Sequence, residues 1–511
     1  MQRRCGSFGP NPRELVLYIQ RFLLSISLCR SLKSVVLAAV VANLLIVCVV
    51  AQNPVPQIVG PVHPDAVAPG SGAFTLSVYG ANFVPGSVVN WNYQPRSTTY
   101  ISGHEVQAQI LATDVETNTA GYITVINPAP GGGSSSASWA QVEVHAPISI
   151  VTLNSPTYYF FGSWITLPAD FNHDAILDIL GECGATGICV DFGLGNGDFG
   201  QDHFAGLGYF PNTQVGYGDF NNDGNLDDVI AQANYETYKA QVHQVTVMFG
   251  NGNGAFQWGP TTKSESDFYM LLVGDFNRDG NLDLVSNGRF MTTFLGNGDG
   301  TFSQGASFKY KYLVDQWAAG DFNGDGILDI ISLQLDPLTV WFFQGNGDGT
   351  FQAPKKVRSF ANTGECTGGG FQTWIQVSDF NGDGKLDLAL CDQKDVIVML
   401  GNGDGTFQKP TYYLADGTGD GEFSFAVGDI NSDGWPDLLV SEYAFIGNSP
   451  PTFDVFPGNG DGTFQTAQVT NVTATQLPEE GIAVGDFNSD GLLDFVYQTD
   501  EGSFVFLNSS K

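Results

Sequence analysis

Residues 379–387 read Asp-Phe-Asn-Gly-Asp-Gly-Lys-Leu-Asp, and variants of this nine-residue string occur seven times in the C-terminal two-thirds of the chain. Successive copies are 46 to 58 residues apart. A repeat of this length predicts a repeat architecture, so the string decides the fold. We number the copies loops 1 to 7; they start at Asp170, Asp219, Asp275, Asp321, Asp379, Asp429 and Asp486.

A second string follows each of the first six loops. Its fullest form is Gly-Asn-Gly-Asp-Gly-Thr-Phe, as at residues 401–407. Around these turns each repeat reads as four short strands, which is typical of a β-propeller blade. A stacked solenoid is the alternative, but it would need capping repeats, whereas the last repeat here is cut short. We therefore expect an all-β protein with a seven-bladed propeller at residues 148–511, in which residues 148–153 supply the missing strand and close the ring.

The parity of the strands determines which loops share a face. Successive strands of a blade run antiparallel, so the Asp loop between strands one and two lies at the same edge as the Gly-Asn-Gly turn between strands three and four. All seven Asp loops therefore share one face. The longest connections project from the opposite face, where we expect ligands to bind.

Oxygen-bearing side chains stand at positions 1, 3, 5 and 9 of each loop, and the glycine common at position 6 allows a sharp turn. This spacing wraps hard oxygen ligands around one cation, as the first half of an EF-hand does. Calcium fits better than magnesium, which demands strict octahedral geometry and keeps its waters. The alternative is a set of Asx-turns that only shape hairpins. Seven copies with three aspartates each favour calcium, because an empty loop would crowd three negative charges together.

Two loops depart from the common pattern. Loop 1 has Ala175 at position 6, with His173 nearby, and alanine is harder than glycine to place in a left-handed conformation. We expect the site in loop 1 to be weak or empty. Loop 6 has Ile430 and Pro436 at positions outside the ligand set, so it should still bind.

The repeats resemble the FG-GAP/VCBS family, which builds the β-propeller of integrin α subunits. The resemblance implies up to seven structural calcium ions, with ligands commonly engaged elsewhere. It also implies that the phenylalanines beside the loops, such as Phe220, pack between blades. The calcium ligands that it implies, at positions 1, 3, 5 and 9, are Asp170, Asn172, Asp174, Asp178, Asp219, Asn221, Asp223, Asp227, Asp275, Asn277, Asp279, Asp283, Asp321, Asn323, Asp325, Asp329, Asp379, Asn381, Asp383, Asp387, Asp429, Asn431, Asp433, Asp437, Asp486, Asn488, Asp490 and Asp494.

Residues 54–146 differ from the repeats and alternate polar and apolar residues. Turn signals such as Pro85-Gly86 separate short alternating stretches at 74–79, 87–91, 106–110, 122–126 and 139–144. This pattern predicts a small β-sandwich. The run Gly80-Ala-Asn-Phe83, followed by Pro85-Gly-Ser87, resembles the TIG/IPT immunoglobulin-like family. That resemblance implies a spacer or interaction domain without chemistry of its own.

Residues 1–51 read as a targeting segment. Six arginines and lysines precede a predominantly apolar run at residues 35–50, as in a signal peptide. We expect cleavage after Ala51; an uncleaved helical membrane anchor is the alternative, although the run is short for a span. In either case the protein would be exported, either secreted or at the cell surface, and would meet a membrane only through this segment.

The charge and the cysteines agree with export. Twenty Lys and Arg against 53 Asp and Glu give a formal net charge of -33, which disfavours nucleic acid as a partner. The four cysteines outside residues 1–51 are an even set, as expected of disulfides in an oxidising compartment. We expect bonds between Cys183 and Cys189 and between Cys366 and Cys391. Four unpaired buried thiols are the alternative.

No catalytic signature accompanies the loops. The sequence has no zinc-protease helix, nucleophile elbow or phosphate-binding glycine loop, and its six His are scattered. We therefore expect not an enzyme but a recognition or adhesion protein that binds an extracellular glycan or protein through the face opposite the calcium loops. There we would examine the aromatic residues Tyr235, Tyr238, Trp374 and Tyr443. The alternatives are a calcium-dependent polysaccharide lyase or hydrolase, which the scarcity of Lys and Arg disfavours, and a purely structural component of the cell envelope.

Overall fold

The computed structural model describes most of one compact unit, Gln52–Lys511. The predicted targeting segment at residues 1–51 lies outside the described residues. Where the structure describes the chain, we find no helix with the length and apolar character needed to cross a bilayer. The described residues are 52–510, except 60–61, 136–138, 160–165, 183–187, 201–202, 205–213, 238–239, 265–267, 269, 288–289, 309–315, 336, 361–374, 392–394, 415–420, 445–451, 472–478 and 500–501.

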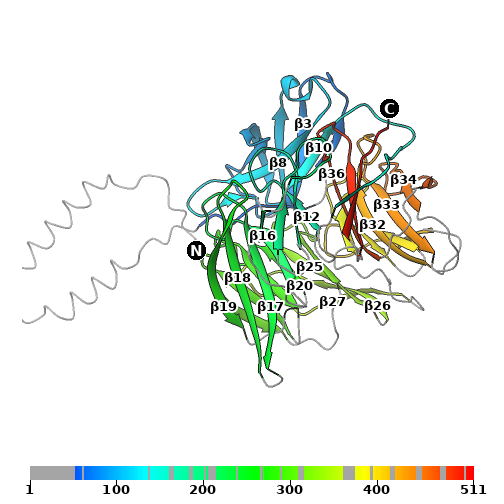
Figure 1. Ribbon diagram of the computed structural model, residues 1–511. Helices are drawn as coiled ribbons and strands as arrows, with labels where there is room; N and C mark the ends of the chain where they lie inside the picture. Colours follow the sequence, from blue (N-terminus) through cyan, green and yellow to red (C-terminus); the bar gives the residue numbers. More distant parts are fainter. Residues whose placement is uncertain are drawn as a thin grey trace, which may run out of the picture. The chain divides into compact units, whose positions relative to one another are not determined.

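The N-terminal part, drawn in blue to cyan in Figure 1, is built from two sheets that share one apolar core. Leu76 and Val106 from one sheet and Val89 and Ile123 from the other are fully buried in it, as the alternating sequence predicts. The first sheet has the order β1 (Gln57–Ile58), β3 (Phe74–Ala81), β7 (Glu105–Ile110), β6 (Ser97–Ser102). The second has the order β2 (Ala66–Val67), β10 (Ala140–Val144), β8 (Thr119–Asn127), β4 (Val88–Trp91), β5 (Gln94–Pro95), with β9 (Gly133–Ser134) on β8 and a 3-10 turn η2 at Ala112–Val115 between β7 and β8. We call this part the sandwich.

The rest of the described chain forms seven four-stranded antiparallel sheets, which we number after the loop that each carries. In every sheet the Asp loop joins the first strand to the second. Sheets 1 to 3 are β12 (Thr166–Ala169), β13 (Asp178–Glu182), β14 (Ile188–Asp191) and β15 (His203–Phe204); β16 (Gln214–Gly218), β17 (Asp227–Thr237), β18 (Ala240–Gly250) and β19 (Phe256–Ser264); and β20 (Met270–Gly274), β21 (Asp283–Asn287), β22 (Met291–Gly296) and β23 (Phe302–Phe308). Sheets 4 and 5 are β24 (Gln316–Gly320), β25 (Asp329–Leu335), β26 (Leu338–Phe343) and β27 (Lys355–Ser359); and β28 (Ile375–Ser378), β29 (Asp387–Cys391), β30 (Asp395–Met399) and β31 (Thr411–Leu414). Sheet 6 is β32 (Gly421–Gly428), β33 (Asp437–Ala444), β34 (Thr452–Phe456) and β35 (Gln468–Asn471), and sheet 7 is β36 (Glu479–Gly485), β37 (Asp494–Thr499), β38 (Gly502–Phe506) and β11 (Thr157–Tyr159).

Sheet 7 is completed by a strand from the other end of the repeat region. The strand is β11 at Thr157–Tyr159, which pairs with β38, and not residues 148–153 as the sequence predicted. Of the predicted stretch, Leu153 forms a single bridge with Asn508, while Ile148 and Val151 are buried in a core with sheets 6 and 7. The apolar side chains of that stretch are used for packing, and the β-branched and aromatic residues that follow Pro156 form the strand.

Apolar clusters lie between successive sheets. Six of them join sheet 1 to 2, 2 to 3, and so on to sheet 7. A further cluster, with Leu177 and Ile179 from sheet 1 and Phe487 and Val496 from sheet 7, joins the last sheet to the first. Contacts between the first strands of the sheets follow the same order. Those of sheets 2 to 7 contact one another in succession, and β36 of sheet 7 also contacts β12 of sheet 1 (Figure 1).

Candidate functional site

Each Asp loop folds its own oxygens inward through backbone hydrogen bonds. In loop 5, Asp379 accepts from the N–H groups of Asp383 at 3.1 Å and Gly384 at 2.7 Å. Asn381 Oδ1 accepts from the Asp383 N–H at 2.9 Å, and Asp383 Oδ1 from the Lys385 N–H at 3.0 Å. A carboxylate has about four lone-pair sites, so positions 1 and 5 keep acceptor capacity for a cation after these bonds. The local geometry is therefore compatible both with a calcium site and with an Asx-turn that binds no ion.

Position 6 adopts a left-handed conformation in all seven loops. Six loops have glycine there, and in loop 1 the non-glycine residue Ala175 has φ 67°. Asp170 of the same loop also accepts from the Tyr93 hydroxyl at 2.8 Å and from the Ala175 N–H at 2.6 Å, both on Oδ2. One carboxylate oxygen of loop 1 thus already has two protein donors, but so has Oδ2 of Asp275 in loop 3, which accepts from the N–H groups of Val55 and Gly280. Weak binding at loop 1 therefore stays a prediction that rests on Ala175.

The strain at Ala175 gives a testable prediction. Replacing Ala175→Gly should raise the free energy of unfolding by roughly 1 kcal/mol, because it removes the Cβ clash of the left-handed conformation. The matched control is Gly224→Ala in loop 2, where φ is 91° and an added Cβ would meet nothing within 4 Å, so only the backbone penalty acts. Denaturant unfolding should give opposite signs for the two variants. A destabilised Ala175→Gly protein would contradict the loop geometry.

Position 9 has a role that the sequence analysis missed. Its aspartate is fully buried in every loop. In the first six repeats its Oδ1 accepts the N–H of the first glycine of the turn, at 2.6 to 3.0 Å. This glycine opens Gly-Asn-Gly in repeats 2 to 6 and is Gly193, followed by Leu194, in repeat 1. In the seventh repeat Asp494 accepts from the Asn508 N–H at 2.8 Å. The turn glycine is needed because the backbones come close: a Cβ on Gly250 would lie against the Leu226 carbonyl. Position 9 therefore ties the Asp loop to the turn of its own sheet.

The buried loop carboxylates are poorly compensated by protein groups. Burial, reinforced by the neighbouring carboxylates of positions 1 and 5, raises the pKa of Asp178, Asp227, Asp329 and Asp387 to about 8. A bound divalent cation would supply the missing positive charge and reverse this shift.

The loops differ in how closely their three carboxylates converge. Among the described residues, only loop 6 brings the oxygens of positions 1, 5 and 9 (Asp429, Asp433 and Asp437) within 4.8 Å of one another. In the other loops the same residue types are present, but the three carboxylates do not meet this spacing. Loop 6 therefore has the most converged donor set. The sequence analysis expected it to bind a cation although Ile430 and Pro436 depart from the common pattern.

The phenylalanines beside the loops pack between sheets, as predicted. Each Phe at loop position 2 contacts the Phe that closes the turn of a neighbouring sheet, for example Phe380 and Phe464 with ring centroids 5.4 Å apart. The same contact joins sheet 7 to sheet 1, through Phe487 and Phe199 at 5.8 Å. Loop 6 has Ile430 instead, and its neighbour, sheet 7, has no such turn; there the Asn508 side chain donates to the Ile430 carbonyl at 2.9 Å.

The sandwich lies against the Asp-loop side of the sheets, a contact that no local sequence pattern indicates. The Val55 N–H donates to Asp275 Oδ2 of loop 3 at 2.8 Å. Tyr93 donates to Asp170 of loop 1, and Ser432 of loop 6 donates to Glu143 at 2.6 Å. The sandwich therefore contacts loops from several repeats.

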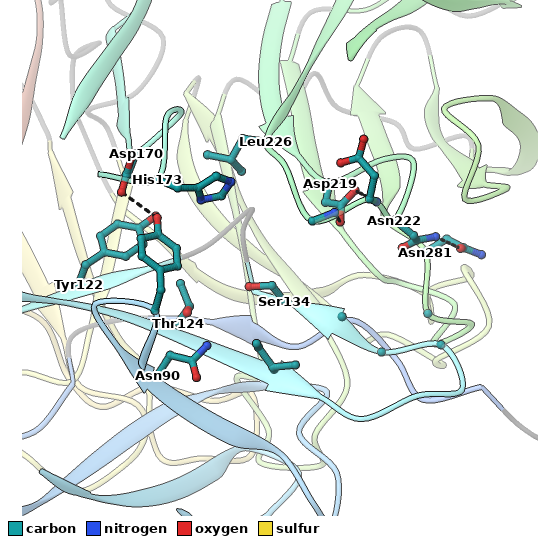
Figure 2. Close-up of a pocket in the computed structure, with 18 of the residues that line it drawn as sticks. Asn90, Tyr122, Thr124, Ser134, Asp170, His173, Asp219, Asn222, Leu226 and Asn281 are labelled. Atoms are coloured by element: carbon teal, nitrogen blue, oxygen red, sulfur yellow. Dashed lines mark hydrogen bonds between the residues drawn. The ribbon is translucent and has the colours of Figure 1, made fainter. Parts of the chain in front are cut away.

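A cavity of about 610 Å³ lies between the sandwich and loops 1 to 3. Figure 2 shows Asn90, Thr124 and Ser134 on the sandwich strands, facing His173 of loop 1 and Asn222 of loop 2. Tyr93 and Tyr122 form part of the wall, with ring centroids 5.5 Å apart. No Lys or Arg is among the described residues that line it. The cavity thus offers hydroxyl, amide and aromatic groups, with the carboxylates of loops 1 and 2 at its edge.

Several sequence predictions concern the side of the sheets away from the loops. The insertion after Ala233 continues β17 and β18 as a longer hairpin. The side chains of Tyr235, Tyr238, Trp374 and Tyr443 lie outside the described residues, so their role stays a prediction. Cys189 and Cys391 are both disulfide-bonded, whereas their predicted partners, Cys183 and Cys366, lie outside the described residues.

Comparison with known proteins identifies the repeats. A family model described as FG-GAP-like repeat matches residues 219–286, 321–373 and 379–440. These three stretches, about a third of the chain, are similar to FG-GAP-like repeats, in agreement with the propeller-like series of four-stranded sheets in the described residues. No curated protein matches the chain.

Solved structures with a similar fold are distant in sequence. A lectin from Agrocybe aegerita that recognises non-reducing terminal N-acetylglucosamine is 18% identical, over 76% of this chain and 96% of that chain, with a TM-score of 0.46. An auxiliary nutrient binding protein from Bacteroides ovatus is 12% identical, over 89% and 98%, with a TM-score of 0.37. A periplasmic gluconolactonase from Pseudomonas aeruginosa is 14% identical, over 71% and 98%, with a TM-score of 0.41.

Proposed function

We propose that this chain is an exported recognition protein in which calcium stabilises a closed, seven-bladed β-propeller, and that the sandwich is a TIG/IPT immunoglobulin-like domain docked on the calcium-loop face. The domains would be residues 1–51 for the targeting segment, 54–146 for the sandwich and 148–511 for the propeller. The proposal is of a binding protein and not of an enzyme.

Contacts between the last sheet and the first support ring closure. The cluster around Leu177 and Phe487 joins sheets 7 and 1, in the same way that six other clusters join the remaining neighbours. The Gly197 N–H of the sheet 1 turn also donates to the Phe487 carbonyl at 3.1 Å. Equivalent bonds join the turns of sheets 3 to 6 to the loops before them. An open stack would leave its end sheets without such partners.

The cavity beside the sandwich is the observation that carries the recognition proposal. Its lining of amide, hydroxyl and tyrosine groups suits a ligand with many hydroxyl groups, since these donate and accept hydrogen bonds while the rings offer apolar faces. The absence of Lys and Arg among the described lining residues disfavours an anionic ligand. We therefore propose a neutral glycan as the ligand and place it here, on the loop side, and not on the opposite face that the sequence analysis favoured.

The enzyme alternative has less support from this cavity. A lyase acting on an acidic polysaccharide would need a positive charge to neutralise the substrate carboxylate, and a base of suitable pKa. Burial, followed by the charges of Tyr122 and Asp170, raises the pKa of Tyr93 far above its usual value, so this phenol stays protonated. Tyr93 is therefore a poor base, although it contacts His173 with ring centroids 5.3 Å apart.

A cavity-blocking variant tests the proposal. Ile126 lines the cavity and is 39% exposed, so Ile126→Trp should fill the space without disturbing the core and should weaken glycan binding at least tenfold. Ile101→Trp is the matched control, because Ile101 is 47% exposed on the same sandwich and does not line the cavity. A glycan array would supply the ligand, and calorimetry would measure the affinities.

Other outcomes of that screen would select a different function. Turnover of acidic polysaccharides would favour the lyase or hydrolase. No binding to any glycan, with intact folding, would favour a structural envelope component. Equal binding by the two tryptophan variants would move the ligand away from this cavity.

A further inference from the structure

Loop 6 differs from the other loops in the partners of its position 3. In the other six loops the asparagine Oδ1 accepts the N–H of position 5. In loop 6, Asn431 Oδ1 has no hydrogen-bond partner, although the residue is only 3% exposed. The Asp433 N–H retains only its bond to Asp429, at 2.9 Å, a bond that position 5 also makes to position 1 in the other loops. A buried acceptor oxygen without a donor costs about 1–3 kcal/mol, so this oxygen requires a partner that the protein does not supply.

A second unpartnered acceptor comes from the sandwich. Asp65 is 6% exposed, and its Oδ1 has no hydrogen-bond partner. Its carbonyl oxygen accepts the N–H of Glu143 at 2.7 Å, and a Cβ added to Gly434 of loop 6 would lie 3.9 Å from the carbonyl oxygen of the next residue, Ala66. Asp65 therefore lies beside loop 6. Its carboxylate is not within 4.8 Å of all three loop carboxylates, so sharing their ion requires its side chain to move towards them.

A third acidic group of the sandwich lies at the same junction. Glu143 is 2% exposed and accepts from the Ser432 hydroxyl at 2.6 Å, which holds it beside loop 6. Within the described part of the chain, the ion pairs are Arg96 with Asp114 and Lys385 with Asp383, and neither involves this junction. Five carboxylates are thus gathered between the sandwich and loop 6, and none of them forms an ion pair with a Lys or Arg among the described residues. Such a group of buried charges is stable only if a cation or protons neutralise it.

We propose that loop 6 and the sandwich share one divalent cation, with Asp65 Oδ1 and Asn431 Oδ1 completing the donor set of Asp429, Asp433 and Asp437. The set is entirely oxygen and carries several negative charges, which suits calcium. The cation would act as a clamp that holds the sandwich on the propeller. This inference rests on the proposed calcium chemistry of the loops and adds a ligand from outside the repeat.

The loop offers its own spectroscopic reporter. Trp435 occupies position 7 of loop 6, and its ring lies 5.2 Å from that of His63 in the sandwich. No other loop has tryptophan at this position. Terbium replaces calcium at oxygen sites and luminesces when a nearby indole is excited. The Trp435 ring also lies close to loop 5, since a Cβ added to Gly382 would be 2.9 Å from it. The part of the terbium signal that is lost in Trp435→Phe therefore reports loops 5 and 6 together. Asp383→Asn, which weakens binding at loop 5, is used as the background in which the Trp435-dependent signal reports loop 6.

The decisive variant is Asp65→Asn, which keeps the size of the side chain and removes its charge. We expect calcium to displace terbium from the Trp435-dependent site at least tenfold less effectively in this variant. Asp223→Asn in loop 2 is the matched control in the same background: it should weaken binding at its own loop and leave the Trp435-dependent signal unchanged.

Thermal unfolding gives a second readout, the shift of the melting temperature of Asp65→Asn relative to wild type. If Asp65 binds the cation, the sign of this shift should differ between chelator and calcium, whereas a packing role alone would give the same sign in both. With a chelator present, Asp65→Asn should melt at or above the wild-type temperature, because a like charge has been removed. With millimolar calcium it should melt below wild type. An unchanged calcium affinity at the Trp435-dependent site would overturn the shared cation and leave the proposed function intact. A complete lack of calcium binding in the wild type would instead overturn both.

Discussion

Removing calcium is expected to lower the unfolding midpoint by on the order of 10 °C. At millimolar calcium and a Kd of about 10⁻⁴ to 10⁻³ M, each loop of the proposed kind would contribute roughly 0.4 to 1.4 kcal/mol of stabilisation. Seven independent loops sum to roughly 3 to 10 kcal/mol, which is comparable to the stability of a typical domain. The measurement is thermal unfolding by calorimetry in calcium and in excess chelator. Because the loops lie at the same edge as the turns that join neighbouring sheets, the loss should affect the whole ring and not one sheet.

Magnesium provides the control for this experiment. It should restore little of the lost stability, because it demands octahedral geometry and keeps several of its waters. Restoration of the unfolding midpoint by calcium but not by magnesium would support metal sites built from flexible oxygen ligands. An identical midpoint with and without chelator would leave the loops as Asx-turns, whose hydrogen bonds the structure also contains.

The second large effect is expected from the packing between sheets 7 and 1. Replacing Phe487→Ala should lower the free energy of unfolding by about 3–5 kcal/mol, since Phe487 is fully buried against Phe199 and the surrounding apolar side chains. The matched variant is Phe322→Ala in loop 4, where the ring is 2% exposed and lies 6.2 Å from Phe407. Denaturant unfolding should show similar losses for the two variants.

The comparison of these two variants is a test of closure. In a closed ring, the contact between the last and the first sheet is equivalent to any other contact between neighbours. In an open stack, Phe487 would lie at a free end and its replacement would cost far less than that of Phe322. A small effect at Phe487 beside a large effect at Phe322 would therefore contradict the ring.

The sequence determined the repeated elements well because each repeat contains its own local signals. The left-handed conformation at loop position 6 follows from the glycine that most repeats have there, and even Ala175 adopts it. The packing of the loop and turn phenylalanines between sheets was also predicted, whereas their contact with each other was not. The strands of the sandwich match the stretches that alternate polar and apolar residues, for example β3 at Phe74–Ala81.

The parts that the sequence did not reveal depend on contacts between distant segments. Residues 148–153 and 157–159 are equally plausible strands locally, and the choice between them is made by the core of sheets 6 and 7. The position of the sandwich on the loops likewise has no local signature, since Asp65 reads in the sequence as an ordinary turn residue. One signal was present and unused: the first six repeats each open their turn with glycine, which indicates the close backbone approach at position 9.

Direct calcium counting tests the central claim, that the recurrent acidic loops hold cations which stabilise the ring. Equilibrium dialysis of the protein against radioactive calcium across the millimolar range would give the number of ions bound per chain. We predict one ion for each of loops 2 to 7, with loop 1 filling last or not at all. Saturation at no more than a single ion per chain would contradict the account.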